Sequence, residues 1–233
     1  MDIRHIAVAV GSRANWGSCK AVCAAIDAHP NLVLTVVCFA SALDDLYGAV
    51  VNDIRALHDV VEIPSLVSGA SHRGMALTSS LTMTGFANYL EGQRPDMLYV
   101  VGDRYEVLPA AYAAALMNVR IAHQMGGELS GTIDESVRHA ITKISHLHFV
   151  ATPAAARRVE RMGEHPLNVH RTGCPRIDLA ARVTPFTTRM RPIFMMHPVT
   201  TEGTAQRKTM AALDAALKCC PTLDVFWPNA DAN

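Results

Sequence analysis

Carboxylates gather at two places in this sequence, each directly after a stretch that is typical of a buried β-strand. Asp103 and Glu106 follow the most apolar stretch, and Glu128, Asp134 and Glu135 follow the next one. Burial and like-charge neighbours raise a carboxyl pKa toward neutrality, which is what a general acid or base requires. The first pair can equally be helix-start carboxylates that complement a helix dipole. The second group is denser than capping needs and therefore predicts a catalytic site.

Basic side chains accompany these carboxylates. Arg138 and His139 lie in the second carboxylate-rich segment and are candidates for substrate binding, although Arg138 can also pair structurally with Glu135 or Asp134. Gly11 and Arg13 lie in the first predicted turn, where glycine permits a tight bend and a helix start favours an anion. Arg13 can clamp a phosphate there, and a solvated arginine in an ordinary turn is an equal alternative. The segment matches neither a G-x-G-x-x-G fingerprint nor a Walker A loop.

Three histidines raise further possibilities. His197 follows a predicted strand at 193–196, where it would face a cleft between two domains; a neutral histidine at a strand end is the alternative. His146 and His148 alternate onto one strand face, but no third ligand stands at a recognisable spacing. We therefore expect no metal site and no cofactor.

Short β-branched apolar runs alternate with longer segments of helical periodicity, which is typical of βα units that build a parallel sheet. The expected strands span residues 3–10, 32–39, 60–63, 97–101, 120–124, 146–151 and 168–172. The expected helices span residues 16–28, 44–58, 72–93, 105–118, 133–144 and 153–162. Strands this apolar indicate a doubly wound sheet covered on both faces. In such a sheet ligands bind at the carboxyl ends of the strands, where the polar segments fall.

The chain divides into two unequal parts. Residues 1–180 are expected to form a Rossmann-like α/β domain that carries the carboxylates, and residues 181–191 a polar, proline-flanked linker. Residues 192–233 begin a second Rossmann-like domain, with a strand at 193–196, a helix at 205–218 and a strand at 223–227. We expect this second domain to be incomplete.

Composition narrows the class of protein. The 233 residues contain 21 Lys+Arg and 21 Asp+Glu, and this balance argues against a nucleic-acid partner. Half of the residues are hydrophobic and 18% are charged, which suits a compact core. No apolar run is long enough to span a membrane, and the N-terminus lacks the form of a secretory signal. Six cysteines without a C-x-x-C pair fit reduced thiols, so we expect a cytoplasmic protein with no membrane partner.

In order along the chain, the polar segments resemble the hydrolysing UDP-N-acetylglucosamine 2-epimerases of sialic-acid and related nonulosonate pathways. The resemblance rests on residues 11–13, 102–106, 126–128, 134–146 and 197–200, and residues 162–164, 173–175 and 228–231 resemble further segments of the family. It implies the GT-B arrangement of two Rossmann-like domains, with a nucleotide sugar bound between them. The implied reaction converts UDP-N-acetylglucosamine and water to N-acetylmannosamine and UDP, by anti elimination of UDP and hydration of the resulting glycal. It also implies a homodimer and no metal or nicotinamide.

The resemblance implies roles for particular residues. Asp103 and Glu128 would transfer protons and activate water, and Asp134 would act as a second acid/base or position the substrate. His197 would act as an acid or bind the leaving phosphate, and Arg13 would offset the charge that develops on UDP.

The chain also departs from the family pattern. Asn15 stands where the family often has aspartate, and residues 39–42 read Phe-Ala-Ser-Ala in place of threonine-glycine-x-histidine. Family members continue past residue 233 through a loop that would hold the diphosphate, so we expect a truncated chain with little or no epimerase activity. A GT-B glycosyltransferase and a non-catalytic nucleotide-sugar-binding remnant are the alternatives. A GDP-linked substrate is also open.

Overall fold

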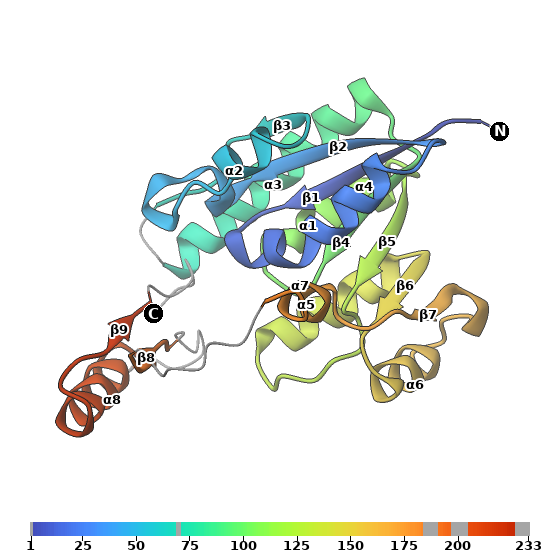
Figure 1. The fold of residues 1–233 in the computed structure, drawn as a ribbon. Coiled ribbons are helices and arrows are strands. Elements are labelled where there is room, and N and C mark those ends of the chain that lie inside the picture. The colour runs from blue at the N-terminus through green and yellow to red at the C-terminus, as the bar shows by residue number, and fades with distance from the viewer. Residues whose placement is uncertain (1, 69–70, 184–190, 197–204, 227–233) are drawn as a thin grey trace.

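A seven-stranded parallel sheet forms the main body of the protein (Figure 1). The structure, a computed structural model, describes residues 2–68, 71–183, 191–196 and 205–226. The strands lie in the order β3-β2-β1-β4-β5-β6-β7, and every neighbouring pair is parallel. Their bounds are β1 Arg4–Val10, β2 Leu32–Phe39, β3 Val60–Ile63, β4 Met97–Val101, β5 Arg120–Gln124, β6 Leu147–Val150 and β7 Val169–Arg171.

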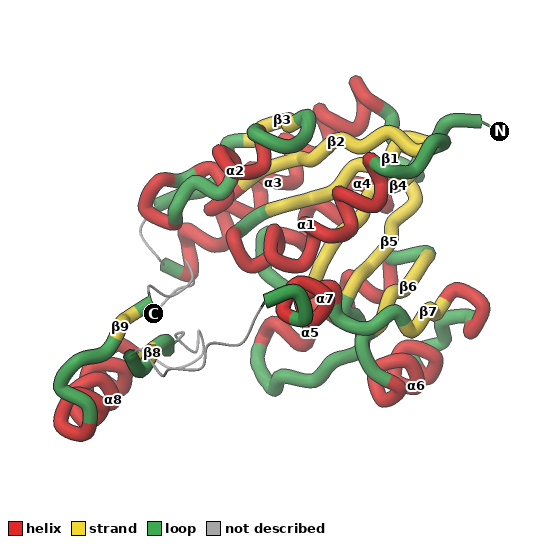
Figure 2. Tube along the Cα trace, in the orientation of Figure 1, coloured by secondary structure: helices red, strands yellow, loops and turns green. Residues whose placement is uncertain are grey.

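Helices cover both faces of this sheet (Figure 2). Their bounds are α1 Arg13–Asp27, α2 Val51–Arg55, α3 His72–Gln93, α4 Val107–Leu116, α5 Ile133–Ile144, α6 Pro153–Arg161 and α7 Pro175–Ala180. Ala7 and Ala9 of β1 pack into a core with α3, α4 and α5, whereas Val8 and Val10 pack into a second core with α1 and α2. Because side chains alternate along a strand, this double burial explains why β1 is apolar at almost every position. The predicted Rossmann-like fold is confirmed.

The strand order changes direction at β1. From β1 the chain moves to β2 on one side, and it later returns to place β4 on the other side. The connections that leave β1 and β4 therefore diverge to opposite faces of the sheet, which opens a crevice at the carboxyl ends of these two strands. The segments that contain Gly11 and Asp103 both lie there.

One predicted helix, at 44–58, is wrong over most of its length. The chain instead forms two 3₁₀ turns, η1 Ala40–Leu43 and η2 Asp45–Tyr47, before the short helix α2. Gly48 and Ala49 have φ angles of 88° and 33°, and two left-handed residues in succession interrupt an α-helix. Helix α7 was not predicted, although Pro175 stands at its first position, where proline is favoured.

The described part of the C-terminal region contains a small βαβ unit. Strand β8, Ile193–Phe194, pairs in parallel with β9, Asp224–Val225, and helix α8, Ala205–Cys219, lies between them in the sequence. The elements expected in this region are therefore present, with shorter strands. His197 and most of the expected linker lie outside the described residues. The domain boundaries stay predictions.

Over the part of the chain that the structure covers, no helix is both long and apolar enough to cross a membrane.

Candidate active site

A pocket of about 160 Å³ occupies the crevice at the carboxyl ends of β1, β4 and β5. Two of the three predicted catalytic carboxylates that the structure describes, Asp103 and Glu128, line it together with Arg138. The complete lining is Ala14, Asn15, Ser18, Val101, Gly102, Asp103, Arg104, Met125, Glu128, Arg138 and Arg176. Segments from both ends of the large domain therefore meet at one site.

Arg138 connects the two carboxylate-bearing segments. Its side chain is only 6% exposed and forms an ion pair with Asp103 through Nη2. The same guanidinium donates from Nη1 to the carbonyl oxygen of Glu128 at 2.7 Å and from Nη2 to Ser130 Oγ at 3.3 Å. Arg138 thus pairs with Asp103, not with the nearby Glu135 that the sequence offered, and it holds the loop after β5 against the loop after β4.

His123, which the sequence analysis did not select, binds the backbone of the residue that precedes Asp103. It is fully buried in β5, and its Nε2 donates to the carbonyl oxygen of Gly102 at 2.8 Å. Its Nδ1 lies 3.2 Å from Thr142 Oγ1 on α5. Burial lowers the pKa of His123 to about 4, so the ring is neutral at pH 7 with its proton on Nε2, and the Thr142 hydroxyl donates to the carbonyl oxygen of Arg138 at 3.0 Å. Gly102 has a φ of 77°, and this bond fixes the left-handed turn from which Asp103 projects.

Asn15 closes the turn after β1. Its Oδ1 accepts from the backbone N–H of Gly11 at 3.1 Å and from Ser12 Oγ at 3.2 Å, while its Nδ2 donates to the carbonyl oxygen of Val101 at 3.3 Å. An aspartate can make the first two bonds but has no proton for the third when ionised. Asparagine therefore satisfies three hydrogen bonds in this turn that an ionised aspartate could not all make.

Gly11 and Glu106 pack against each other beside the pocket and do not line it. A Cβ atom on Gly11 would lie 2.9 Å from Phe39 Cζ and 3.0 Å from Glu106 Cγ, so only glycine fits. The Glu106 side chain is 1% exposed, and Oε1 lies 2.5 Å from Nε of Arg104. Their role in substrate binding stays a prediction.

Three further predicted residues lie outside the pocket lining. Arg13 is exposed, and its Cδ lies 3.4 Å from the place that a Cβ atom on Gly48 would occupy. Asp134 is in the first turn of α5, and His139 is one turn further along. His139 Nδ1 is buried, and it has no hydrogen-bond partner among the described residues. The roles expected for these residues also stay predictions.

Arg176 lines the pocket and was likewise not selected from the sequence. It belongs to α7, and it reaches α1, where Nε donates to Ser18 Oγ at 2.8 Å and Nη2 donates to the carbonyl oxygen of Ala14. The only sequence signal was the resemblance of residues 173–175 to the family, directly before this arginine.

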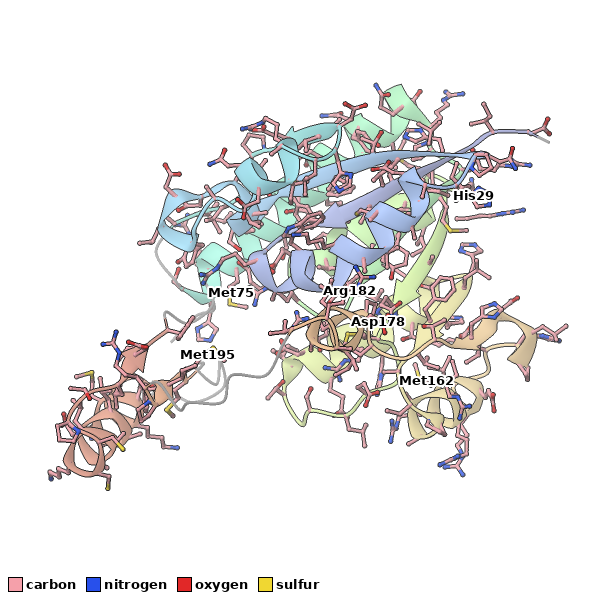
Figure 3. The ribbon with its side chains drawn as sticks, viewed as in Figure 1. His29, Met75, Met162, Asp178, Arg182 and Met195 are labelled. Atoms are coloured by element: carbon pink, nitrogen blue, oxygen red, sulfur yellow. The ribbon has the colours of Figure 1, made fainter. Side chains whose placement is uncertain are left out.

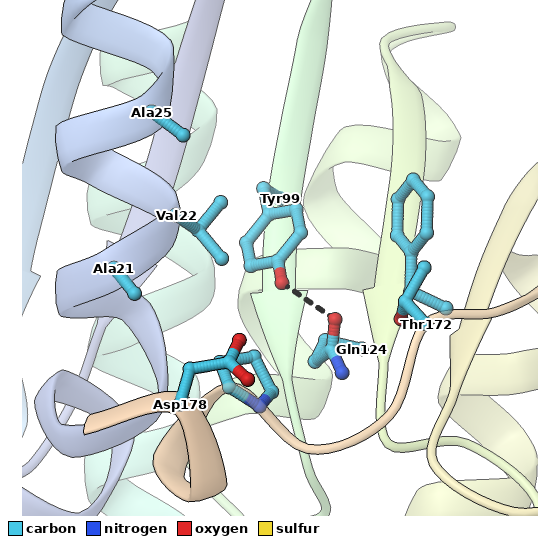
Figure 4. Close-up of a pocket in the computed structure, with 9 residues that line it drawn as sticks. Ala21, Val22, Ala25, Tyr99, Gln124, Thr172 and Asp178 are labelled. Carbon is cyan, nitrogen blue, oxygen red and sulfur yellow. Dashed lines mark hydrogen bonds between the residues drawn. The ribbon is translucent and has the colours of Figure 1, made fainter. Parts of the chain in front are cut away.

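A second pocket, of about 280 Å³, lies between α1, α7 and the sheet (Figure 4). Tyr99 donates its hydroxyl proton to Gln124 Oε1 at 2.9 Å, and Gln124 Nε2 donates to the carbonyl oxygen of Gly173 at 3.2 Å. This chain of hydrogen bonds anchors the segment that leads into α7, and it thereby helps to place Arg176.

No three His, Cys, Asp or Glu side chains within the described ranges are grouped so that they could hold a metal ion. His146 Nδ1 accepts from the backbone N–H of Ile121 at 3.2 Å, and His148 Nε2 lies 3.2 Å from Glu164 Oε2. Both histidines thus have ordinary protein partners.

The architecture defines a Rossmann-like α/β protein with a polar pocket at its topological switch point, the place where such sheets bind nucleotide ligands. A family profile described as UDP-N-acetylglucosamine 2-epimerase matches residues 24–233, so the chain belongs to that family.

Individual relatives agree with this assignment. The chain is 34% identical to a Legionella pneumophila protein named UDP-N,N'-diacetylbacillosamine 2-epimerase (hydrolyzing), over 98% of this chain and 65% of that protein. It is 31% identical to a Neisseria meningitidis UDP-N-acetylglucosamine 2-epimerase, over 98% of this chain and 64% of that protein. The chain thus spans less than two thirds of the length of these curated relatives.

The fold is shared with solved structures of the family. A Methanocaldococcus jannaschii UDP-GlcNAc 2-epimerase, solved with UDP-GlcNAc and UDP, superposes with a TM-score of 0.74 at 13% identity. The match covers 95% of this chain and 66% of that one. The seven-stranded sheet and its helices accordingly have the Rossmann-like fold of a GT-B N-terminal domain, as the sequence predicted.

Proposed function

We propose that this chain carries the acid–base site of a hydrolysing UDP-N-acetylglucosamine 2-epimerase, which converts UDP-N-acetylglucosamine and water to N-acetylmannosamine and UDP. The observation that carries the proposal is the meeting of Asp103 and Glu128 in one pocket, braced by Arg138. A cytoplasmic location and a homodimer are part of the same proposal.

The reaction explains why two carboxylates are needed. The C2 proton of the sugar lies beside an acetamido group, which does not acidify it, so its removal has to accompany departure of UDP. A carboxylate takes the C2 proton, the C–H electrons form the C1=C2 double bond, and the C1–O bond to the diphosphate breaks. Water then adds its oxygen to C1, and a proton is delivered to C2 from the opposite face. Proton removal and delivery on opposite faces require two groups that flank the ring.

Asp103 and Glu128 suit these two tasks because they come from different strand ends. Asp103 follows β4 and is held by Arg138, whereas Glu128 follows β5 and accepts a long hydrogen bond from Thr152 Oγ1 at 3.4 Å. In this proposal they exchange protons and activate water, and Asp134 serves as a second acid/base or positions the sugar. His197 and Arg13 would act on the leaving UDP.

Incubation of the 233-residue chain with UDP-N-acetylglucosamine in D₂O tests the proposal. Any N-acetylmannosamine formed, at the low rate expected of this chain, should carry deuterium at C2, and its formation should be lost in the isosteric variant Asp103→Asn. The same assay should be run with UDP-N,N'-diacetylbacillosamine and with the GDP-linked sugar. The first is included because one relative is named a UDP-N,N'-diacetylbacillosamine 2-epimerase. Transfer of the sugar to an added acceptor with its C2 configuration retained would instead identify a glycosyltransferase. Binding of UDP without any turnover would indicate a non-catalytic module.

A further inference from the structure

The pocket has two chemically different sides. The side formed by the ends of β4 and β5 presents the carboxylates of Asp103 and Glu128. The side formed by the start of α1 presents the neutral groups of Asn15 and Ser18, with the guanidinium of Arg176 bound to Ser18 and to the backbone of Ala14. Arg138 and Arg104 also line the carboxylate side, where they pair with Asp103 and Glu106. A ligand that fills the pocket therefore meets the carboxylate of Glu128 on one side and the guanidinium of Arg176 on the other.

Three arginines line the pocket, and only one of them is without a carboxylate partner in the part of the chain that the structure describes. Arg138 pairs with Asp103, and Arg104 pairs with Glu106. Arg176 is held by a hydroxyl and a carbonyl oxygen, both of which are uncharged. Its positive charge is therefore not neutralised within the site, although its position is fixed.

The neighbourhood of Arg176 also favours an anion. The two acceptors that hold it, Ala14 and Ser18, lie in the first turns of α1, where the N–H groups and the helix dipole present positive potential. A guanidinium has five N–H donors, and two of its nitrogens are engaged here. The remaining donors suit the oxygens of a phosphate group, which arginine binds through two parallel hydrogen bonds.

We propose that Arg176 binds the diphosphate of the nucleotide sugar and thereby sets the orientation of the substrate in the pocket. The uncharged sugar then lies against Asp103 and Glu128, and the diphosphate lies against Arg176 and the start of α1. This orientation puts the reacting C1–O bond between the carboxylate side and the cationic side. It deepens the proposed function and rests on it, and it names Arg176, rather than Arg13, as the pocket arginine that contacts the diphosphate.

Calorimetric titration of the whole chain with UDP, with inorganic pyrophosphate and with uridine tests this inference. Arg176→Ala should weaken the binding of UDP and of pyrophosphate by about tenfold or more, because a charged hydrogen-bond partner of the ligand is lost. Binding of uridine, which has no phosphate, should be unchanged. Arg176→Lys should be intermediate, because an ammonium group cannot hold α1 and the ligand with a planar fork.

Arg182→Ala is the matched control, since it removes the same charge from an exposed side chain just beyond α7 (Figure 3). It should leave the binding of all three probes unchanged. Ser18→Ala keeps the guanidinium but removes one of its anchors, so it should weaken UDP binding by a smaller factor.

Two results would overturn the inference. One is unchanged UDP affinity in Arg176→Ala, with a lowered melting temperature as the sole effect, because that would mean that Arg176 only docks α7 on α1. The other is a failure of the unaltered chain to bind either UDP or pyrophosphate. Titration requires no turnover, so it tests this inference separately from the reaction. If UDP binding depended on Arg176 but the chain had no epimerase activity, the inference would stand and only the proposed function would be contradicted.

Discussion

His123 donates a hydrogen bond from Nε2 to the carbonyl oxygen of Gly102, at 2.8 Å, from a position with no solvent exposure. Through this bond β5 controls the backbone of the residue that precedes Asp103. Through Thr142, which lies 3.2 Å from Nδ1 of the same ring, β5 is also tied to the helix that carries Arg138. One neutral imidazole therefore links the turn that projects Asp103 to the helix that pairs with it.

The lowered pKa of His123 predicts a pH-dependent stability. The unfolded chain binds a proton on this histidine below about pH 6.5, whereas the folded chain resists protonation down to about pH 4. The contribution of His123 to the free energy of unfolding is therefore fully present above about pH 6.5 and is lost as the pH falls from there toward about pH 4. Its size is roughly 3 kcal/mol. Burial lowers the pKa of His148 as well, so protonation of that residue also decreases the stability of the fold at acidic pH.

The variant His123→Gln isolates this contribution. Urea denaturation between pH 4 and pH 7.5 should show a smaller loss of unfolding free energy in the variant than in the unaltered chain, because His148 still titrates but His123 does not. Parallel pH profiles for the two proteins would contradict the role of His123.

Arg138→Met should disrupt the candidate active site and destabilise the fold. The substitution leaves Asp103 without its ion-pair partner and removes the donors to the Glu128 carbonyl and to Ser130. Loss of hydrogen bonds from a buried charged group predicts a decrease of about 2 kcal/mol in unfolding free energy. Arg138→Lys, which keeps the charge but not the fork, should lose less. An exposed ion pair contributes about 0.5 kcal/mol. A decrease in unfolding free energy no larger than this in Arg138→Met would show that the Arg138–Asp103 pair contributes little.

Gly11→Ala should destabilise the protein by about 1–3 kcal/mol, because its Cβ atom would overlap the Phe39 ring at 2.9 Å. Gly92→Ala is the matched control, since the structure places nothing within 4 Å of a Cβ atom there and the residue lies within helix α3. That control should gain about 0.5–1 kcal/mol from the higher helix propensity of alanine. Chemical denaturation measures both, and equal effects would contradict the packing assigned to Gly11.

Asn15→Asp should destabilise this chain. The carboxylate loses the hydrogen bond to the Val101 carbonyl oxygen and faces that oxygen with negative charge instead. A cost of about 1–3 kcal/mol at pH 7 is expected for an unsatisfied buried acceptor. The cost should decrease at acidic pH, where a protonated aspartate can donate again. A variant as stable as the unaltered chain at pH 7 would show that the turn adapts.

Sequence reasoning located most of the fold because periodicity is a local property. The seven strands of the large sheet follow from short apolar runs, and α3 and α5 agree with their predicted bounds. The helix expected at 44–58 was wrong because its interruption depends on the backbone angles of Gly48 and Ala49, and composition does not reveal those angles. Helix α7 was missed because it spans only six residues, the first of which is a proline.

The sequence by itself determined the fold class and the presence of Asp103 and Glu128 at the carboxyl ends of neighbouring strands, with Arg138 on the helix that follows, since strand alternation and topology place those ends together. Only the tertiary structure decided which partners meet. It paired Arg138 with Asp103, put buried His123 beneath Gly102, turned Arg13 toward Gly48, and brought Arg176 to Ser18 across 158 positions of sequence. Such pairings depend on how helices pack on the sheet, and no local pattern of residues encodes a contact between segments so far apart.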